Sequence, residues 1–402
     1  MIKIFFVLFE MGFLVKWNFI GEISISELFL IFSSIYYVSR TRPFHNTVLR
    51  STSYLILALI LVQIITESII GNELNNALKG IAINIVAFLH ICFLYYYLRK
   101  DRRNVVWFAL GFLLRNLLLF SETDFDDLTY EDIEADSVSL YFIKFKLVPV
   151  IDALLVFLAV YFYKRSFGLF ALIVGVILVL LGARSGGAII IISGLVTFLL
   201  LRRKSFKFFK FYVIVFVIIS YGFYCIYANQ VLNGKIKSGN SEQLLKVENP
   251  YNPINLLAMG RTEVFVSFVA FTDRPWTGWG AKAIDPNYYY RTLMMELKNQ
   301  DYRPPKRNTI PTHSVLIGSG MKNGVFAFIC MLLIFFIVIR RSYFLLKFPN
   351  DYYYIICFYL SFFVWEMLFS PQSSFRYTIP LPIAFIYVSW ELKKKELFKR
   401  SF

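Results

Sequence analysis

The sequence predicts an all-α membrane protein that crosses the bilayer about twelve times, and three observations support this fold class. Of 402 residues, 58% are hydrophobic and 17% are charged, whereas soluble domains carry about 25% charged residues. Uncharged apolar runs of membrane-spanning length recur from end to end. The 44 Phe and 26 Tyr residues are too many for one water-soluble core. The bilayer is therefore the expected solvent.

The apolar runs give the predicted spans, and the outer loops divide them into domains. The first two spans are the weakest, because Glu10 and Lys16 interrupt one and Glu22 and Glu27 lie near the following turn. The first run lacks the cleavage site of a signal peptide. The spans are 3–19, 24–39, 51–70, 79–98, 104–120, 147–163, 166–183, 187–201, 211–229, 313–339, 351–369 and 377–391. The predicted divisions are 1–165, 166–229, an outer loop at 230–312, and 313–402.

The distribution of charge predicts the orientation. Alternate loops, counted with both termini, hold 23 of the 42 basic residues and only four acidic ones. By the positive-inside rule, both termini lie in the cytoplasm. The net charge of +16 then reflects topology, and the expected partners are membrane lipids rather than nucleic acid.

Two outer loops are long. Residues 121–146 are acidic but lack EF-hand order, so they form either a solvated loop or a weak contact for a divalent cation or an acceptor sugar. Residues 230–312, about 80 in number, are long enough for an outer domain. Within them, 256–272 predicts a short amphipathic helix on the membrane surface.

The first candidate functional feature is the turn Gly182-Ala183-Arg184-Ser185-Gly186 at the outer face. Arginine near hydrocarbon usually has an anionic partner, and small neighbours let a bulky ligand approach. The alternative is an arginine that snorkels from a tight turn. Position alone does not separate these readings.

The second feature is Gly260-Arg261, followed by the loop 273–280 that contains Arg274, Trp276 and Trp279. An arginine beside a helix N-terminus makes an anion site, although it can also be a headgroup contact. The tryptophans can anchor the chain at the interface, their commoner role, or form platforms for sugar rings.

The third feature is His313, at the outer start of the tenth span. A helix N-terminus and partial burial both disfavour an imidazolium, and a neutral imidazole can accept a proton from a hydroxyl. A helix-cap contact is the alternative. Arg291 and Arg303 add positive charge to the same outer surface, and together with Arg274 they are the candidate substrate-loop residues.

These features predict a cationic pocket with one base at the outer membrane face. The sequence contains no metal-ligand spacing, nucleotide loop or nucleophile triad, and its four cysteines form no CxxC pair, so no metal or other cofactor is expected. The energy for a synthetic reaction must then come from an activated substrate. A lipid-linked diphosphate sugar fits, because arginines stabilise the charge of a diphosphate leaving group.

In order and placement, these segments resemble the O-antigen ligase and Wzy-type O-antigen polymerase superfamily. The matching segments are Gly182 to Gly186, Gly260-Arg261 with 274–280, and His313-Ser314 running to Gly324. Ser314 stands where Asn is common, and Trp276 where an aliphatic residue is common. The resemblance covers about 180–340, and the first 165 residues share only hydropathy with the family.

The resemblance implies a GT-C-like membrane glycosyltransferase that inverts the configuration at the anomeric carbon and needs no metal. It acts on undecaprenyl-diphosphate-linked glycan donors and acceptors in the bacterial cytoplasmic (inner) membrane. His313 would activate the acceptor hydroxyl, and Arg184 and Arg261 would bind the donor diphosphate. Arg376, between the last two spans, is a weaker match for the same role. A chain-length regulator and a flippase are the implied protein partners.

Three functions stay open. Composition favours a polymerase of surface polysaccharide over a ligase that transfers glycan to lipid A–core. A transporter or flippase also fits twelve spans, with Asp152, Arg115 and Glu366 as its intramembrane ionic residues. However, the two halves of the chain show no repeat of the kind transporters usually carry.

Overall fold

The computed structural model describes residues 2–18, 22–118, 142–162, 166–201, 209–235, 244–245, 247, 249–298 and 308–400. Most of the predicted acidic loop and Arg303 lie outside these ranges. The elements are α1 Ile2–Met11, β1 Lys16–Asn18, β2 Glu22–Ser24, α2 Ile25–Phe32, α3 Ser34–Thr41, α4 Arg50–Ile70, α5 Leu74–Lys100, η1 Arg102–Asn104, α6 Val105–Leu118, η3 Ile143–Leu147, α8 Val148–Tyr161, α9 Phe167–Leu180, α10 Arg184–Leu201, α11 Phe209–Leu232, α13 Pro253–Gly260, α14 Thr262–Asp273, η5 Pro286–Tyr288, α15 Tyr289–Leu297, α16 Val315–Lys347, α17 Tyr353–Phe369, α18 Ser374–Tyr377 and α19 Pro380–Arg400.

The structure confirms the helical membrane class. Among the described residues, α4, α5, α10 and α16 are long and apolar enough to cross a bilayer, and α8, α9 and α17 are shorter apolar helices. Helices satisfy their own backbone hydrogen bonds, which a spanning segment must do in lipid. The number of twelve spans stays a prediction.

The N-terminal region differs from the two predicted spans at 3–19 and 24–39. Helix α1 ends at Met11, and β1 pairs antiparallel with β2, with Trp17 opposite Ile23. The second predicted span is broken at Ser33 into α2 and α3. The predicted second span begins as α2 directly after β2, because Ser24 and Glu27 form a capping box at this point.

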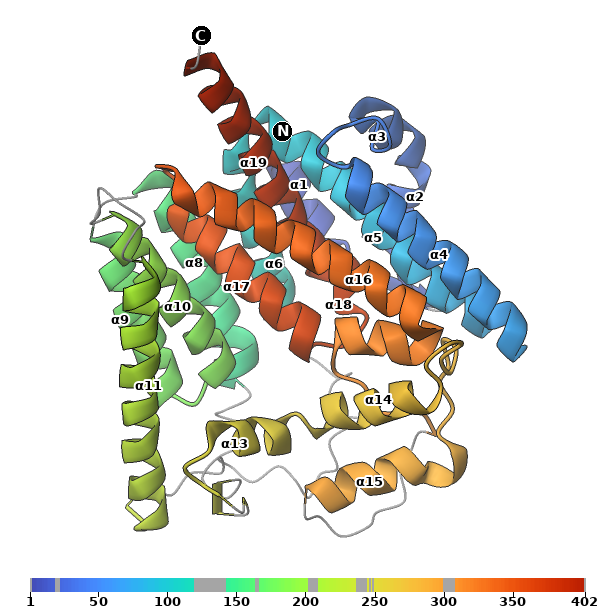
Figure 1. The fold of residues 1–402 in the computed structure, drawn as a ribbon. Helices are drawn as coiled ribbons and strands as arrows, with labels where there is room; N and C mark the ends of the chain where they lie inside the picture. Colours follow the sequence, from blue (N-terminus) through green and yellow to red (C-terminus); the bar gives the residue numbers. More distant parts are fainter. Residues whose placement is uncertain are drawn as a thin grey trace.

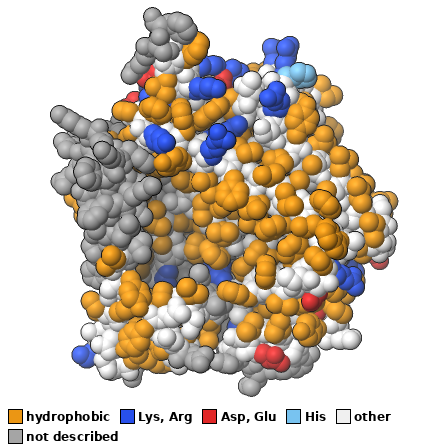
Figure 2. All heavy atoms as spheres, viewed as in Figure 1, with side chains coloured by type: hydrophobic (Ala, Val, Ile, Leu, Met, Phe, Trp, Pro, Cys, Tyr) orange, Lys and Arg blue, Asp and Glu red, His pale blue; other side chains and the backbone are white. Residues whose placement is uncertain are grey.

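The helices form a bundle whose ends differ in character (Figure 1). Both chain ends lie at the top of this view, while α13, α14 and α15 lie across the opposite end. Figure 2 shows a broad band of hydrophobic side chains between a Lys- and Arg-rich upper end and the lower end. This arrangement fits a chain whose middle is surrounded by lipid.

The α9–α10 hairpin places Arg184 at its turn. The two helices approach closely because glycines face each other: a Cβ on Gly175 would lie 2.9 Å from the Gly187 carbonyl oxygen. Gly182 turns the chain with a φ of 93°, which favours glycine. Arg184 then begins α10.

Candidate active site

The start of α16 is fixed against α17, and His313 lies directly before it. The Ser314 hydroxyl accepts a hydrogen bond from Ile317 N at 3.1 Å and donates to the Met367 carbonyl oxygen at 3.3 Å. Ser314 is the N-cap of α16 and is buried. His313 itself is exposed. The cap therefore holds the backbone of a histidine whose ring a substrate can reach.

Arg261 lies between α13 and α14, as the N-cap residue of α14. Its guanidinium carbon lies 5.2 Å from the centre of the Trp365 ring on α17, a cation–π distance. Within the described residues its side chain makes no hydrogen bond or ion pair. Burial lowers its pKa, against the opposing charges of Glu263 and Glu366.

Glu263, in the first turn of α14, binds Lys298 at the end of α15. Their Oε1 and Nζ atoms are 2.6 Å apart, and the two side chains are 20% and 23% exposed. Burial by itself would raise the pKa of Glu263. The hydrogen bond and charge of Lys298, with a contribution from His313, lower it below its ordinary value.

These side chains act on the charge of His313 and with it form one group, the His313 cluster: His313, Arg261, Glu263 and Lys298. Desolvation lowers the pKa of His313; Glu263 opposes this, while Arg261 and Lys298 lower the pKa further. A histidine with a lowered pKa is neutral near pH 7 and can act as a proton acceptor. The arrangement thus combines a neutral base with an arginine whose N–H donors form no hydrogen bond with the described residues.

Arg184 belongs to a different group of contacts. Its Nη2 donates to the Tyr227 hydroxyl of α11 at 3.0 Å. Tyr227 and Leu256 of α13 pack against the same buried cluster of Ala228, Val231 and Leu244. Arg184 therefore lies near α13, the helix that ends at Gly260, but its contacts are not with the His313 cluster.

Arg376 already has an acidic partner. Its Nη1 lies 3.1 Å from Glu27 Oε1 on α2. Two residues on, Thr378 donates to Glu366 Oε2 at 2.7 Å, and Glu366 is one of the carboxylates that act on Arg261. The segment that carries Arg376 thus borders the site by way of Glu366.

The three substrate-loop candidates have different surroundings. Arg274 is exposed, with its guanidinium carbon 3.9 Å from the centre of the Trp279 ring. The Arg291 Nε donates to the Thr309 carbonyl oxygen at 3.1 Å and ties two parts of the outer loop together. Arg303 lies outside the described residues. The described contacts of Arg274 and Arg291 are made within the outer loop itself.

The tryptophan–glycine loop after α14 fits against a break in α16. Gly324 leaves the helical conformation (φ 78°, ψ −176°). Backbone bonds join the two segments there: Trp279 N to Met321 O at 2.9 Å, Gly280 N to Lys322 O at 2.8 Å and Val325 N to Pro275 O at 2.7 Å. These bonds satisfy groups that the break leaves free. Trp279 donates to Ala270 O at 2.7 Å, whereas Trp276 is 71% exposed.

Sequence reasoning missed Glu263, Lys298 and Trp365. Glu263 is two residues from Arg261, but an acidic residue in a first helical turn is ordinary. Lys298 is one of many loop charges, and Trp365 lies in an apolar run. Their roles depend on packing between α14, α15 and α17, for which the sequence carries no local signal.

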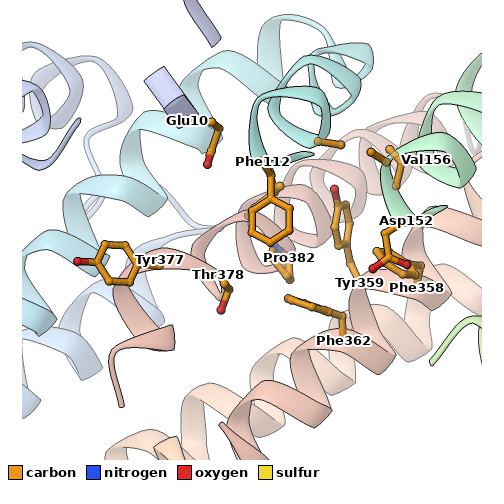
Figure 3. A pocket seen from close by; sticks show the side chains of 13 residues that line it. Glu10, Phe112, Asp152, Val156, Phe358, Tyr359, Phe362, Tyr377, Thr378 and Pro382 are labelled. Atoms are coloured by element: carbon orange, nitrogen blue, oxygen red, sulfur yellow. The ribbon is translucent and has the colours of Figure 1, made fainter. Parts of the chain in front are cut away.

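A separate cavity of about 60 Å³ lies among α1, α6, α8, α17 and α19 (Figure 3). Glu10 and Asp152 both line it. Glu10 pairs with Arg115 at 3.4 Å, and Asp152 Oδ1 is buried without a hydrogen-bond partner among the described residues. None of the lining residues belongs to the His313 cluster, although Thr378 lines the cavity and binds Glu366.

Comparison with known proteins identifies the central part of the chain. A family model described as O-antigen ligase matches residues 167–332. This range contains Arg184, Arg261 and all other members of the His313 cluster, while Arg376 lies beyond it. No curated protein matches the chain. Residues 167–332 are therefore similar to the O-antigen ligase and Wzy-type polymerase superfamily of membrane proteins.

Proposed function

We propose that the protein polymerises undecaprenyl-diphosphate-linked repeat units into O-antigen or capsular polysaccharide. The observation that carries this proposal is the His313 cluster, in which an exposed histidine of lowered pKa shares its surroundings with Arg261, an arginine without a described counter-ion bond. The match of residues 167–332 to the family model supports a glycosyltransferase of the ligase or polymerase type.

The proposed reaction is a direct displacement at the anomeric carbon of the donor. His313 takes the proton of an acceptor sugar hydroxyl as its oxygen attacks. The bond from the anomeric carbon to the lipid diphosphate breaks, with inversion of configuration. Arg261 binds the departing diphosphate and stabilises its charge. The described surroundings of Arg184 and Arg376 differ, and their binding to the same diphosphate stays a proposal.

The proposed location is the outer face of the bacterial cytoplasmic membrane, with both termini inside. No nucleotide is needed there, because the donor bond to diphosphate supplies the free energy. A chain-length regulator and a flippase are the proposed protein partners. No metal is proposed, because His313 and Arg261 together supply the base and the leaving-group charge.

A ligase that transfers glycan to lipid A–core is the second candidate. The family model that matches this chain is described as O-antigen ligase, and the chemistry at His313 would be the same. The acceptor alone separates the two functions. A polymerase uses another lipid-linked repeat unit, and a ligase uses lipid A–core.

The test is a glycan-transfer assay on purified protein. Lipid-diphosphate-linked repeat units are supplied with EDTA and without nucleotide. We expect a ladder of longer lipid-linked glycans from the parent protein. His313→Ala should lower the rate by a factor of about 10² to 10⁴. His45→Ala, which changes an exposed histidine outside the site, should leave the rate unchanged.

Two outcomes would overturn the proposal. Transfer that begins only after lipid A–core is added would identify a ligase. Absence of transfer with either acceptor would reject the glycosyltransferase function. Loss of the ladder in EDTA, restored by a divalent cation, would reject metal independence while leaving the transfer itself established.

A further inference from the structure

An acidic residue in the N-terminal part of the chain holds one of the arginines that the sequence links to the donor. Glu27 Oε1 lies 3.1 Å from Arg376 Nη1. Glu27 is 1% exposed and lies on α2, about 140 residues before the segment that matches the family model. Arg376 lies after that segment. The pair therefore joins two parts of the chain that the family comparison does not cover.

Both residues of the pair make further contacts. Glu27 Oε2 accepts hydrogen bonds from Ser24 N at 2.7 Å and from Ser24 Oγ at 3.0 Å, so its carboxylate is fixed by the capping box. The buried His90 ring places Nδ1 3.0 Å from the Arg376 carbonyl oxygen. The Arg376 guanidinium carbon lies 4.4 Å from the centre of the Tyr377 ring. These contacts fix the Glu27 carboxylate and the Arg376 backbone, and the guanidinium contacts both Glu27 and the Tyr377 ring.

The arginine keeps hydrogen-bonding capacity that the described residues do not use. Its Nε is buried and has no partner among the described residues. A guanidinium presents five N–H donors in a fixed fork, and the ion pair with Glu27 that the described residues show involves one nitrogen. The nearby Thr378 binds Glu366 at 2.7 Å, on the side of the molecule where Arg261 lies against Trp365.

We propose that Glu27 is a positioning residue for Arg376, orienting its guanidinium toward the diphosphate of a lipid-linked donor. This inference rests on the proposed function and assigns α2 a part in the donor site. The physical reason is preorganisation: an arginine held in one geometry loses less entropy when an anion binds.

The test measures undecaprenyl diphosphate binding by the full-length protein in detergent, together with thermal unfolding. A charge-assisted hydrogen bond is worth roughly tenfold to a hundredfold in affinity, so Arg376→Gln should weaken binding by that factor. Glu27→Gln should weaken it by a smaller but measurable factor. Because Glu27 acts through Arg376, Glu27→Gln should have no further effect in the Arg376→Gln background.

The matched control is Glu73→Gln, at an exposed position before α5, where the carboxylate accepts a hydrogen bond from Asn76 Nδ2 at 3.0 Å. It should leave the dissociation constant unchanged. Glu27→Asp keeps the charge and should bind better than Glu27→Gln. If Glu27→Gln lowers the unfolding temperature but not the affinity, the residue is only structural. If the two substitutions add fully, Glu27 does not act through Arg376.

The binding measurement separates this inference from the proposed function. A parent protein that binds undecaprenyl diphosphate but transfers no glycan would contradict the proposed function and leave the Glu27 effect measurable. A parent protein that transfers glycan, with donor affinity unchanged in Arg376→Gln and in Glu27→Gln, would contradict only the positioning of Arg376.

Discussion

The charge of the His313 ring depends on side chains from two other elements. Arg261 and Glu263 come from the start of α14, and Lys298 follows α15. Desolvation and the two cations lower the pKa of His313, and Glu263 alone among these neighbours raises it. A general base works only in its neutral form. The pH dependence of transfer therefore reports this balance.

We expect the acid limb of kcat/KM to have its midpoint below the ordinary histidine pKa of about 6.5. Activity is present above that midpoint and is lost as the pH falls through it, because His313 then becomes protonated. Glu263→Gln removes the opposing negative charge and should move the midpoint to still lower pH. Glu296→Gln, at an exposed position of α15, should not move it. A shift to higher pH in Glu263→Gln would contradict the arrangement.

The role of Arg261 in the donor site can be tested by comparison with Arg274, which has a similar contact. Both guanidinium groups lie over tryptophan rings, but only Arg261 belongs to the His313 cluster. Arg261→Ala should lower kcat/KM by about 10² to 10³, as removal of a charge-stabilising donor does. Arg274→Ala should lower kcat/KM less than Arg261→Ala does and cost about 0.5–1 kcal/mol in stability. Steady-state kinetics and thermal unfolding of both variants decide this, and equal kinetic losses would count against a special role for Arg261.

At the scale of elements, the break in α16 couples this helix to the outer loop. A Cβ on Gly324 would clash with the Trp276 carbonyl oxygen, and the φ of 78° disfavours other residues. Gly324→Ala should therefore cost about 1–3 kcal/mol and loosen the loop from the helix. Gly222→Ala in α11, where no atom of the described residues lies within 4 Å of the added Cβ, is the control and should be neutral or slightly stabilising. Thermal unfolding and proteolysis of the outer loop measure both, and an unaffected Gly324→Ala would show that the loop does not depend on the break.

The same break shows where sequence reasoning stops. The apolar run at 313–339 predicts a helix, and α16 forms there and continues to Lys347. Gly324 was recognised only as part of a motif, because a break supported by backbone bonds from another segment has no hydropathy signal. The hairpin after α1 was missed for a related reason: its residues are apolar enough to resemble a span, and the Ser24 capping box acts only locally.

For the candidate site, the sequence predicts the main residues but not the ion pairs that surround them. His313 and Arg261 stand out because each lies at a helix start in the outer region, a position with a physical meaning in sequence. The ion pair between Glu263 and Lys298 joins residues 35 apart, and that between Glu27 and Arg376 joins α2 to α18. Such pairs depend on how helices pack, and a single sequence does not encode that packing in any short pattern.

At the scale of the whole molecule, the two ends of the bundle carry different chemistry. The end with both termini is rich in Lys and Arg, and the opposite end holds α13, α14 and α15 (Figures 1 and 2). His313 and Arg261 belong to this second end. The positive-inside rule orients such a molecule with its basic end in the cytoplasm, which would place the base and the donor arginine where lipid-linked glycans are joined.

This orientation gives the last prediction, tested by cysteine labelling in intact cells. The four native cysteines are first replaced by serine, and activity is checked. Tyr251→Cys, at an exposed position before α13, should react with a membrane-impermeant maleimide. Lys399→Cys, near the end of α19, should react only after the cells are permeabilised, because its basic neighbours hold that end inside. The reverse pattern would place His313 in the cytoplasm, where a lipid-linked donor on the outer leaflet could not reach it, and the proposed reaction would then lose its substrate.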